Sequence, residues 1–564
     1  MKDTIAKLLK KALADLKIEQ KEKEIENALE IPPSSELGDY SFPCFSLKEK
    51  LKDNPSKIAL EIRNHIPKSE TIDYVQSNGP YVNFFLNKKK IAKDLIKEIS
   101  TKKNKFGSMN FSGKSMIEFS QPNTHKAFHV GHIRGTSIGE SLARILEFSG
   151  EKVLRANYQG DTGMHVAKWI WCYKKYHSRE KLKSDESWIA SIYVDAVKKL
   201  AQNEKLQEEV DIINRKLFEG KDKALIELWK KTRKLSLDSF KIIYNQLNTH
   251  FNEYFFESQL EKKGKDIVNE LLKKKIAEIS DEAVIVDLKK YNLGVWVLLR
   301  KDGTVLYSAK DLALAEEKFK KFKLNKSIYV VGAAQSLHMA QLFKTLELMK
   351  FRQAKDLIYV PFSEVRLPTG KMSSRTGDNI LYSEFIEEMT SYSAKEIKKR
   401  FPSISKTELE KRALKISIAA IKYSMLKQNS NKVLVFSKED ALNFEGDSGA
   451  YILYSYARAS SILKKANKKK KQFSIEKQLE KAEFELIKKL FQFKDAVTSA
   501  YNNMNPSVIA NYSYQLSQLF NEFYHSCPVI NSDNEQFRLA LVSSFRQVLK
   551  NSLYLLGIET IEEM

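Results

Sequence analysis

The feature that most restricts the fold is a succession of strand, turn, helix and strand that begins near residue 115. SMIEFS (115–120) predicts a short strand, and residues 132–148 carry apolar side chains at helical spacing. Gly150 stands where a helix C-cap belongs, and KVLRANY (152–158) predicts a second strand. Two strands joined by a helical crossover pair in parallel with a right-handed connection, so this segment predicts a Rossmann-like sheet.

Two later apolar segments extend the predicted sheet. IYVV (328–331) and DLIYVPF (356–362) have the length and continuous apolarity of buried parallel strands. Residues 175–275 carry a mostly charged helical pattern, which predicts an insertion into the nucleotide-binding fold. We therefore expect a Rossmann-like domain over residues 111–385.

Domains are also expected on both sides of this one, because 564 residues are too many for one compact core. Residues 1–110 combine helical patterns with the β-rich run YVNFFLN (81–87), which predicts a small α+β domain. Residues 386–564 are almost entirely helical in pattern and predict an all-α bundle. The expected fold class is multidomain α/β, with a Rossmann-like parallel sheet between an α+β domain and a helical bundle.

The balance of charge is compatible with a polyanionic partner. Lys and Arg number 95 against 71 Asp and Glu, a formal net charge of +24. Such an excess attracts nucleic acid from a distance, and each phosphate contact releases condensed counterions. The alternative is a lysine-rich proteome, visible in runs such as residues 468–471. Charge alone leaves both interpretations open.

Cysteine usage and the first residues indicate where the protein works. Cys44, Cys172 and Cys527 are scattered and form no CxxC pair, so neither a structural metal nor a disulfide framework is expected. The N-terminal MKDTIAKLLKKALADL predicts an amphipathic helix rather than a signal peptide. No stretch has the roughly 20 apolar residues that span a bilayer, so we expect a cytoplasmic protein with no membrane partner.

A pair of histidines, in His129-Val130-Gly131-His132, lies between the first predicted strand and the helix. A helix N-terminus offers unpaired N–H groups and partial positive charge to a phosphate. Two imidazoles beside it can donate hydrogen bonds to negative charge that builds on that phosphate. Gly131 would let a nucleotide approach the backbone where a Cβ would block it. The alternative is a pair of partly buried histidines at a helix start.

A second motif, GKMSSR (370–375), follows the strand DLIYVPF. A glycine, a cation and small hydroxyls on a predicted loop suit a mobile clamp on leaving pyrophosphate. Loops with Lys and Ser are common, so this motif alone is a weak signal. It becomes informative because it follows the histidine motif in the chain.

These motifs resemble the HIGH and KMSKS signatures of class I aminoacyl-tRNA synthetases, and the residues around them resemble the arginyl-tRNA synthetase family. The matching blocks are EFSQPNTHKAFHVGHIRGTSIGE (118–140), NYQGDTG (157–163), DGTVLYSAKDLA (302–313) and VVGAAQSLHMAQ (330–341). GDYSFP and NGPYVNFFLN resemble the N-terminal extension of the family, and YILYSYARASSILKKA resembles its helical anticodon-binding domain. The resemblance covers nearly the whole chain.

The resemblance implies an activity in two steps. ATP, as its Mg²⁺ complex, would activate L-arginine to arginyl-adenylate with release of pyrophosphate, and the adenylate would then load tRNA(Arg) with release of AMP. A monomer without an obligatory protein partner is the expectation for the family. The resemblance also implies that the first step needs bound tRNA.

Arginine is expected to meet five residues. Glu118 and Asn123 resemble positions that hold the α-amino group and carboxylate, and Tyr307, Asp311 and Gln335 resemble positions that line the guanidinium pocket. Asp311 would supply charge-assisted hydrogen bonds, and a buried carboxylate left without its cation would reject neutral amino acids. Without the resemblance, Asp311 could be an exposed helix-start residue and Tyr307 an ordinary strand aromatic.

Catalysis is expected to rest on four residues. His129 and His132 would stabilise the transition state, Lys126 the α-phosphate, and Lys371 the leaving pyrophosphate. The residues expected to contact ATP are His129, Gly131, His132, Lys371, Met372, Ser373 and Ser374.

The sequence departs from the usual pattern at two places. Ser374 stands where many class I enzymes have a second lysine, and Lys126, upstream of the histidines, is the expected compensation, with Arg375 the less favoured one. Thr162 replaces the usual aromatic residue after Gly160-Asp161, which removes no expected substrate contact.

Contacts with tRNA are expected at both ends of the chain, where aromatic residues are interleaved with cations. The N-terminal domain would meet the tRNA elbow, and the helical domain would meet the anticodon. The expected residues are Tyr81, Phe84 and Phe85 in the first domain, and Tyr451, Tyr454, Tyr456 and Arg458 in the second. Core packing is the alternative for each tyrosine of the helical stripe.

Three other functions are compatible with parts of the pattern. A nucleotidylyltransferase would share HxGH and the sheet but would be shorter and would lack the helical tail. A non-catalytic tRNA-binding relative would have no reason to keep the histidines and Lys371. A different amino acid, cysteine in particular, would call for zinc ligands that the three scattered cysteines do not resemble.

Overall fold

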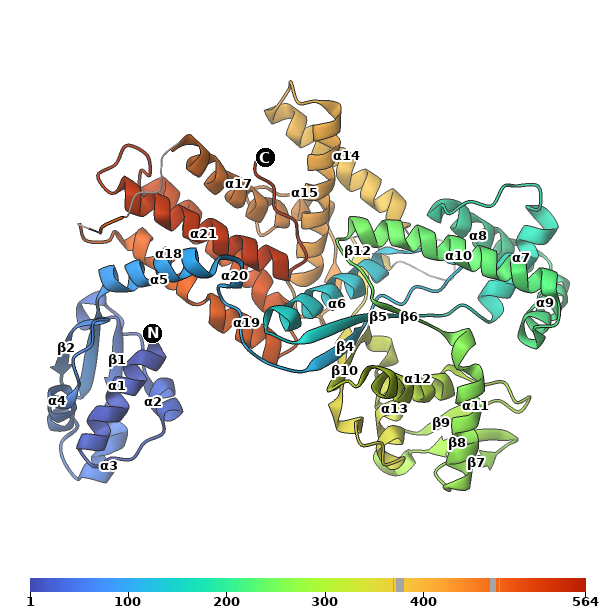
Figure 1. Ribbon diagram of the computed structural model, residues 1–564, viewed down its shortest axis with the longest axis horizontal. Helices are drawn as coiled ribbons and strands as arrows, with labels where there is room; N and C mark the ends of the chain where they lie inside the picture. Colours follow the sequence, from blue (N-terminus) through green and yellow to red (C-terminus); the bar gives the residue numbers. More distant parts are fainter. Residues whose placement is uncertain (369, 372–379, 467–472, 476) are drawn as a thin grey trace. The chain divides into compact units, whose positions relative to one another are not determined.

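The computed structural model describes the whole chain except residues 369, 372–379, 467–472 and 476 (Figure 1). The described residues group into two compact units. Unit 1 contains residues 1–103, 467–491 and 522–544, and unit 2 contains residues 104–466, 492–521 and 545–564. Among the described helices, none combines the length and apolarity needed to cross a lipid bilayer.

Unit 1 is built around an antiparallel sheet of order β1-β3-β2, formed by Tyr40–Pro43, Tyr81–Leu86 and Ile72–Asn78. The helices of its N-terminal part are α1 (Lys2–Asp15), α2 (Glu22–Ala28), α3 (Lys48–Leu51), α4 (Pro55–His65) and α5 (Lys88–Lys102). Val82, Phe84 and Leu86 point into the core because strand side chains alternate between faces. The predicted α+β fold is confirmed, and α18 (Lys481–Phe491) belongs to the same unit.

Unit 2 contains the predicted parallel sheet, in the order β11-β10-β4-β5-β6. Its strands are β4 (Lys114–Glu118), β5 (Lys152–Gln159), β6 (Glu253–Phe256), β10 (Lys326–Gly332) and β11 (Leu357–Phe362), all paired in parallel. The Rossmann-like prediction is confirmed. Strand β6 was not predicted, because EYFF is four residues long inside a charged helical stretch.

Helix α6 (Val130–Phe148) connects β4 to β5 and lies along the sheet (Figure 1). Two glycines explain how closely it packs. A Cβ at Gly139 would lie 2.1 Å from the ring of Phe119, and one at Gly135 would lie 2.8 Å from the ring of Phe362. A side chain at either position would push the helix off the sheet, so these glycines set the place of the helix N-terminus.

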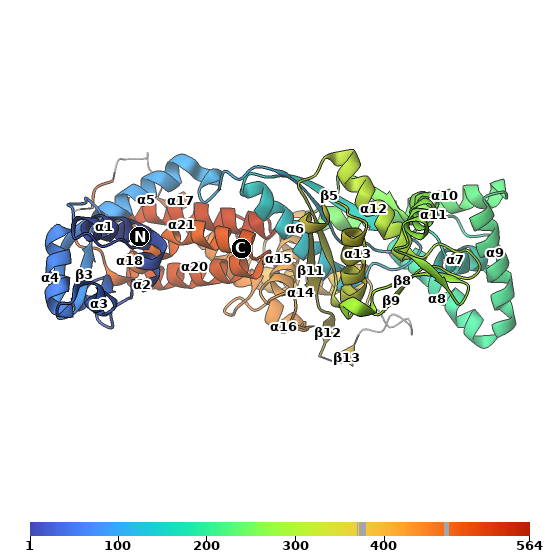
Figure 2. The ribbon, with the colours of Figure 1, turned by 90° about the horizontal axis from the view of Figure 1, so that it is seen from below.

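Helices pack together in the segment between β5 and β6, which overlaps the predicted insertion of residues 175–275 (Figure 2). They are α7 (Met164–Tyr176), α8 (Glu186–Gln202), α9 (Gln207–Glu219) and α10 (Lys223–Gln246). After α11 (Glu257–Lys273) comes an antiparallel sheet of β7 (Glu278–Ser280), β8 (Ala283–Asp287) and β9 (Val295–Leu299), followed by α12 (Tyr307–Phe322) and α13 (Ser336–Leu348). This second sheet was not predicted.

The region after residue 385 is helical, as predicted. Its helices are α14 (Tyr382–Arg400), α15 (Lys406–Leu426), α16 (Lys438–Ala441), α17 (Gly449–Lys465), α18, α19 (Phe493–Asn502), α20 (Ser507–Ser526) and α21 (Glu535–Leu555). The short strands β12 (Val365–Leu367), β13 (Gly370–Lys371) and β14 (Leu434–Val435) form a small sheet in unit 2.

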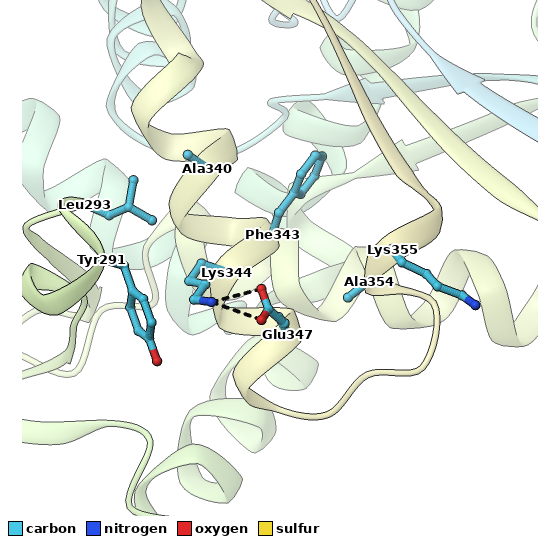
Figure 3. A pocket seen from close by; sticks show the side chains of 8 residues that line it. All are labelled: Tyr291, Leu293, Ala340, Phe343, Lys344, Glu347, Ala354 and Lys355. Atoms are coloured by element: carbon cyan, nitrogen blue, oxygen red, sulfur yellow. Dashed lines mark hydrogen bonds and ion pairs between the residues drawn. The ribbon is translucent and has the colours of Figure 1, made fainter.

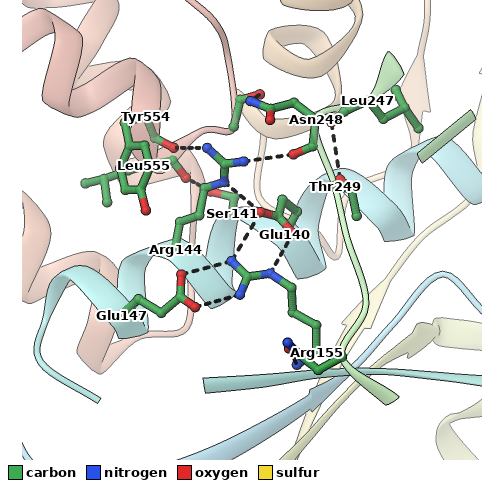
Figure 4. A network of polar contacts seen from close by, with 12 residues as sticks. Glu140, Ser141, Arg144, Glu147, Arg155, Leu247, Asn248, Thr249, Tyr554 and Leu555 are labelled. Atoms are coloured by element: carbon green, nitrogen blue, oxygen red, sulfur yellow. Dashed lines mark hydrogen bonds and ion pairs between the residues drawn. The ribbon is translucent and has the colours of Figure 1, made fainter. Parts of the chain in front are cut away.

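A buried polar network fixes the middle of α6 (Figure 4). The Arg144 guanidinium donates to the carbonyls of Tyr554 at 3.2 Å and Asn248 at 2.8 Å, and its Nε donates to Glu140 at 2.6 Å. Arg155 of β5 also donates to Glu140, at 2.9 Å. Helix α6 is therefore joined to the sheet, to the end of α10 and to the end of α21.

Lys422 of α15 makes a second connection at this point. Its ammonium donates to the carbonyl of Leu247 at 2.6 Å and to that of Gly557 at 2.8 Å. Burial lowers the pKa of Lys422 to about 7. The Lys422 ammonium therefore connects the turn after α10 to the residues that follow α21.

Candidate active site

The two histidines of the HVGH motif lie together at the first turn of α6. Their ring centroids are 3.8 Å apart, and the backbone N–H of His129 donates to Nδ1 of His132 at 3.1 Å. Because a backbone N–H can only donate, Nδ1 of His132 carries no proton and Nε2 carries it. His132 therefore has an N–H donor on the ring nitrogen that this bond does not use.

Both imidazoles are kept neutral by their surroundings. Burial, reinforced by the Lys126 cation, lowers the pKa of His129 to about 4. Burial and the neighbouring His129 and Lys126 lower the pKa of His132 well below its ordinary value. At neutral pH the pair can donate hydrogen bonds without carrying charge.

Gly131 has a packing role beside the one predicted from the sequence. A Cβ at this position would lie 3.0 Å from the His129 ring, tighter than nearly all observed Cβ contacts. A side chain at residue 131 would therefore displace the first histidine, and the predicted approach of a nucleotide stays a prediction.

The cation of Lys126 contributes to the lowered pKa of both histidines. Its ammonium lies 5.2 Å from the ring of Tyr193, on α8 of the insertion. Burial and the cation of Lys168 lower the pKa of Lys126. The structure thus brings three of the four predicted catalytic residues together.

The second motif is described only at its edges. Gly370 and Lys371 form β13, whose backbone pairs with β12, and Met372, Ser373, Ser374 and Arg375 lie outside the described residues, as does the side chain of Lys371. Beyond them Leu381 forms a backbone bridge with His129, and the N–H of Tyr382 donates to Phe128 at 3.0 Å. The segment after this motif therefore returns to the histidine motif.

A cavity of about 220 Å³ opens at the carboxyl ends of β4, β5 and β10. This is the edge where open α/β sheets bind ligands. All five residues predicted to bind arginine line it: Glu118, Asn123, Tyr307, Asp311 and Gln335. Lining residues that the sequence did not single out include Gln121, Tyr158, Glu257, Tyr329 and His338.

Asp311 lies in the second turn of α12 and has one engaged and one unengaged oxygen. Its Oδ2 is 2.7 Å from Nε2 of His338. Its Oδ1 is buried and has no hydrogen-bond partner among the residues that the structure describes. A buried carboxylate oxygen without a donor is costly, so this atom is suited to a donor from a ligand.

Three carboxylates line the cavity, and two of them are paired with lysines. Glu118 is bound by the Lys318 ammonium and accepts from Gln121 at 2.6 Å. Glu257 is 3.5 Å from the Lys310 ammonium. Asp311 pairs with the imidazole of His338 instead, and among the described residues no lysine lies within ion-pair distance of it.

The other predicted arginine ligands lie at the open side of the cavity. Tyr307 begins α12 and is 54% exposed, so it is neither buried nor on a strand. Gln335 and Asn123 are exposed loop or turn residues. A Cβ at Gly160 would lie 2.3 Å from Oδ1 of Asn123, so the glycine leaves room for that side chain.

The structure corrects two of the residues expected to contact tRNA. Phe84 is fully buried in the core of unit 1, and Tyr456 is 1% exposed in unit 2. Both side chains pack in the protein core and are not accessible to RNA. Tyr81 and Phe85, on the other face of β3, stay partly exposed, and Phe85 stacks on Tyr74 with ring centroids 4.1 Å apart.

The remaining residues of the helical stripe form one polar group. Arg458 donates to the Tyr454 hydroxyl at 2.9 Å and to Asn521 at 2.7 Å, and Asn521 donates to the Tyr451 hydroxyl at 2.8 Å. All three predicted side chains are half-buried. Internal bonds thus hold them in a fixed arrangement.

A second cavity, of about 540 Å³, lies on another face of α13 (Figure 3). Its lining includes Tyr291, Phe343 and the ion pair of Lys344 with Glu347, 3.0 Å apart. It contains none of the residues predicted for ATP, arginine or tRNA.

The cysteines are buried and unpaired. Cys172 lies near His177 and Asp195, with ligand-type atoms all within 4.8 Å of one another. The thiol is 3.4 Å from Asp195, and the His177 ring lies between Asp195 at 3.0 Å and Glu180 at 2.6 Å. Each of these groups is hydrogen-bonded to a neighbour in the structure.

Profiles of known protein families match nearly the whole chain. The profile for "tRNA synthetases class I (R), catalytic domain" matches residues 95–437, "Arginyl tRNA synthetase N terminal domain" matches 3–86, and "DALR anticodon binding domain" matches 452–564. The chain belongs to the arginyl-tRNA synthetase family. The family prediction is confirmed, and the nucleotidylyltransferase alternative is excluded.

Individual members of the arginyl-tRNA synthetase family agree over nearly the full chain. The arginine–tRNA ligase of Clostridium acetobutylicum is 36% identical, over 95% of this chain and 96% of its own. That of Clostridium perfringens is 36% identical, over 98% and 97%. The arginyl-tRNA synthetase structure from Thermus thermophilus is 25% identical, with a TM-score of 0.81 and full coverage of both chains.

Proposed function

We propose that the chain ligates L-arginine to tRNA(Arg) through an arginyl-adenylate, using ATP with Mg²⁺ and releasing AMP and pyrophosphate. The observation that carries the choice of amino acid is Asp311, with its buried, unbonded Oδ1 in a cavity at the sheet edge. The lysines pair the other two carboxylates, so a cationic side chain entering the cavity has Asp311 as its counterion.

A guanidinium suits this counterion better than an ammonium does. It presents a planar fork of N–H donors that can meet a carboxylate oxygen and a phenol at the same time. Tyr307 supplies that phenol at the open side, and Gln335 adds an amide oxygen. The predicted bond between Glu118 and the α-amino group also remains part of this proposal.

Adenylate formation needs positioning and charge stabilisation rather than a general base. The arginine carboxylate is already ionised near pH 7 and attacks the α-phosphate in line. In our proposal Asn123 orients the carboxylate end, and the neutral N–H donors of His129 and His132 meet charge developing on the phosphate. Lys126 neutralises the α-phosphate, and Lys371 with Met372, Ser373 and Ser374 follows the pyrophosphate.

Transfer to tRNA requires contacts in both units. Unit 1 offers the stacked pair of Tyr74 and Phe85, of which Tyr74 is 54% exposed, as a platform for an unstacked base of the elbow. Unit 2 offers Tyr451, Tyr454 and Arg458 to the anticodon. We propose that the enzyme acts in the cytoplasm as a monomer.

Charging assays test the proposal directly. Total tRNA is aminoacylated with each radiolabelled amino acid in turn, and ATP–pyrophosphate exchange is measured with and without tRNA. We expect charging by arginine, with exchange that depends on tRNA. Charging by another amino acid would refute the Asp311 pocket, and no charging at all would favour a non-catalytic tRNA-binding protein.

A matched pair of variants separates RNA binding from chemistry. Phe85→Ala should weaken tRNA binding by about 5- to 150-fold, the range for loss of one stacked base, without changing the KM for ATP. Tyr176→Ala removes an aromatic ring that is 42% exposed, at the end of α7, and should leave tRNA affinity unchanged. Equal effects of the two changes would remove β3 from the RNA contact.

A further inference from the structure

The imidazole of His338 occupies the space between the arginine cavity and the second sheet of unit 2. It lies in α13 and is 9% exposed. On one side its Nε2 is 2.7 Å from Oδ2 of Asp311, and on the other its Nδ1 is 3.3 Å from Nε1 of Trp296. Trp296 is a buried residue of β9.

The bond from Trp296 fixes the state of the imidazole. An indole N–H can donate but cannot accept, so Nδ1 of His338 is the acceptor and carries no proton. The ring proton then lies on Nε2 and points to Asp311. His338 is therefore a neutral donor that leaves the negative charge of Asp311 in place.

The same ring also contacts the other residue proposed to hold the guanidinium. The Tyr307 ring meets the His338 ring edge to face, with centroids 4.8 Å apart. One side chain thus limits the rotation of both Asp311 and Tyr307. With Oδ2 held by the imidazole, Oδ1 is the oxygen that remains for a ligand.

We propose that His338 is the positioning residue of the guanidinium site, and that Trp296 holds it in the tautomer that donates to Asp311. This inference rests on the proposed function, since it assumes that Asp311 binds the guanidinium. A lysine in place of the imidazole would have paired Asp311 as Lys318 pairs Glu118, and would have cancelled the charge that selects arginine. A neutral donor orients the carboxylate and keeps that charge.

The test compares three changes around the ring. His338→Leu removes the donor at similar volume, and His338→Gln places an amide N–H near the position of Nε2. Trp296→Phe removes the donor to Nδ1 and keeps a ring. Leu337→Ala, at an exposed neighbour on the same helix, is the control. The readouts are the dissociation constant of arginine by calorimetry, the KM values for arginine and ATP, and kcat, with thermal melts to verify folding.

His338→Leu should weaken arginine binding by about 10- to 100-fold, the effect of losing a hydrogen bond to a charged group. The KM for ATP should stay within about twofold, because the ATP site is untouched. His338→Gln should recover most of the affinity, Trp296→Phe should give an intermediate loss, and Leu337→Ala should match the wild type.

Two outcomes would overturn the inference while the proposed function stands. One is arginine affinity within twofold of wild type in folded His338→Leu. The other is a loss in His338→Gln as large as in His338→Leu, with the KM for ATP rising in parallel, which would indicate a merely structural role. If the wild type does not charge arginine at all, the proposed function fails and this inference falls with it.

Discussion

The carboxylate of Glu118 is bound by the ammonium of Lys318, 200 residues away in the chain, and both side chains are withdrawn from solvent. Glu118 ends β4 and Lys318 lies in α12, so the pair joins the strand before the histidine motif to the helix that carries Asp311. Burial alone would lower the pKa of Lys318, but the charge of Glu118 raises it above its ordinary value. The lysine is therefore a fixed cation under the cavity.

Removing this lysine should destabilise the protein. Lys318→Met keeps most of the side-chain volume but leaves the buried Glu118 without its partner, which costs about 3–5 kcal/mol in comparable buried pairs. We expect a lower midpoint of thermal unfolding. The double variant Lys318→Met with Glu118→Gln should regain much of the loss, and a double variant no more stable than the single one would contradict the pairing.

Asp311 should decide the choice of amino acid. Asp311→Asn keeps the shape but removes the charge, so kcat/KM for arginine should fall by about 100-fold or more, with the KM for ATP nearly unchanged. Asp302→Asn, in the exposed loop before α12, is the control. Steady-state aminoacylation measures both, and similar values for the two variants would refute the counterion role.

His132 should matter for turnover more than for binding. His132→Ala removes a neutral N–H donor from the phosphate site, and kcat for pyrophosphate exchange should fall by about 100-fold or more. The dissociation constant of ATP should change much less, which calorimetry can verify. Unchanged turnover would remove this residue from the mechanism.

Lys126 should compensate for the second lysine of the KMSKS signature, whose place Ser374 takes in this chain. Lys126→Ala should lower kcat by an amount similar to His132→Ala, about 100-fold, and Arg375→Ala should have a smaller effect. Exchange assays on the two variants decide the question. If Arg375→Ala is severe and Lys126→Ala is mild, the compensation has been placed on the wrong residue.

The free energy of unfolding should fall at low pH because the buried imidazole of His125 has a low pKa. Both ring nitrogens of His125 contact threonine hydroxyls, Thr124 at 3.0 Å and Thr232 at 2.8 Å, and burial first, then His165 and Arg233, lower its pKa to about 3. The unfolded chain binds the proton near pH 6.5, before the folded chain does. Stability should therefore fall as pH drops from about 6.5 toward 3, by about 1.4 kcal/mol per pH unit from this group.

Urea unfolding at pH 7 and pH 5, followed by tryptophan fluorescence, measures this effect because Trp169 lies 5.3 Å from the His125 ring. His125→Gln should show a smaller loss between the two pH values. His65→Gln, at an exposed histidine, should behave as the wild type. Equal pH dependence in all three proteins would show that His125 is not the responsible group.

The sequence was sufficient where a pattern is local. The strand and helix around HVGH were predicted, because alternation and helical spacing are properties of neighbouring residues. Strand alternation also accounts for the error at Phe84, since Phe84 and Phe85 must face opposite sides of β3 and the apolar face includes Val82 and Leu86. Tyr454 and Tyr456 likewise face different sides of α17, because residues two positions apart on a helix do not share a face.

Contacts between distant segments were beyond such patterns. Lys318 was one of many lysines on a charged helix, and nothing near it in the sequence pointed to Glu118. His338 was contained in the block VVGAAQSLHMAQ, which placed it near the site but gave it no partner. Its proposed role depends on Trp296, which lies in a sheet of short strands that no local sequence pattern predicted.

The bonds from Arg144 and Lys422 to the carbonyls of Tyr554 and Gly557 connect residues 554–557 to α6, the helix that follows the histidine motif, and to α15. A protein truncated before residue 554 would remove one acceptor from each of these two buried cations, at about 1–3 kcal/mol each, next to the helix that begins at Val130. Such a truncation would be expected to abolish adenylate formation even with every RNA contact intact. Inactivity of a shortened chain would therefore say little about anticodon recognition, and affinity tags at this end are better separated by a spacer.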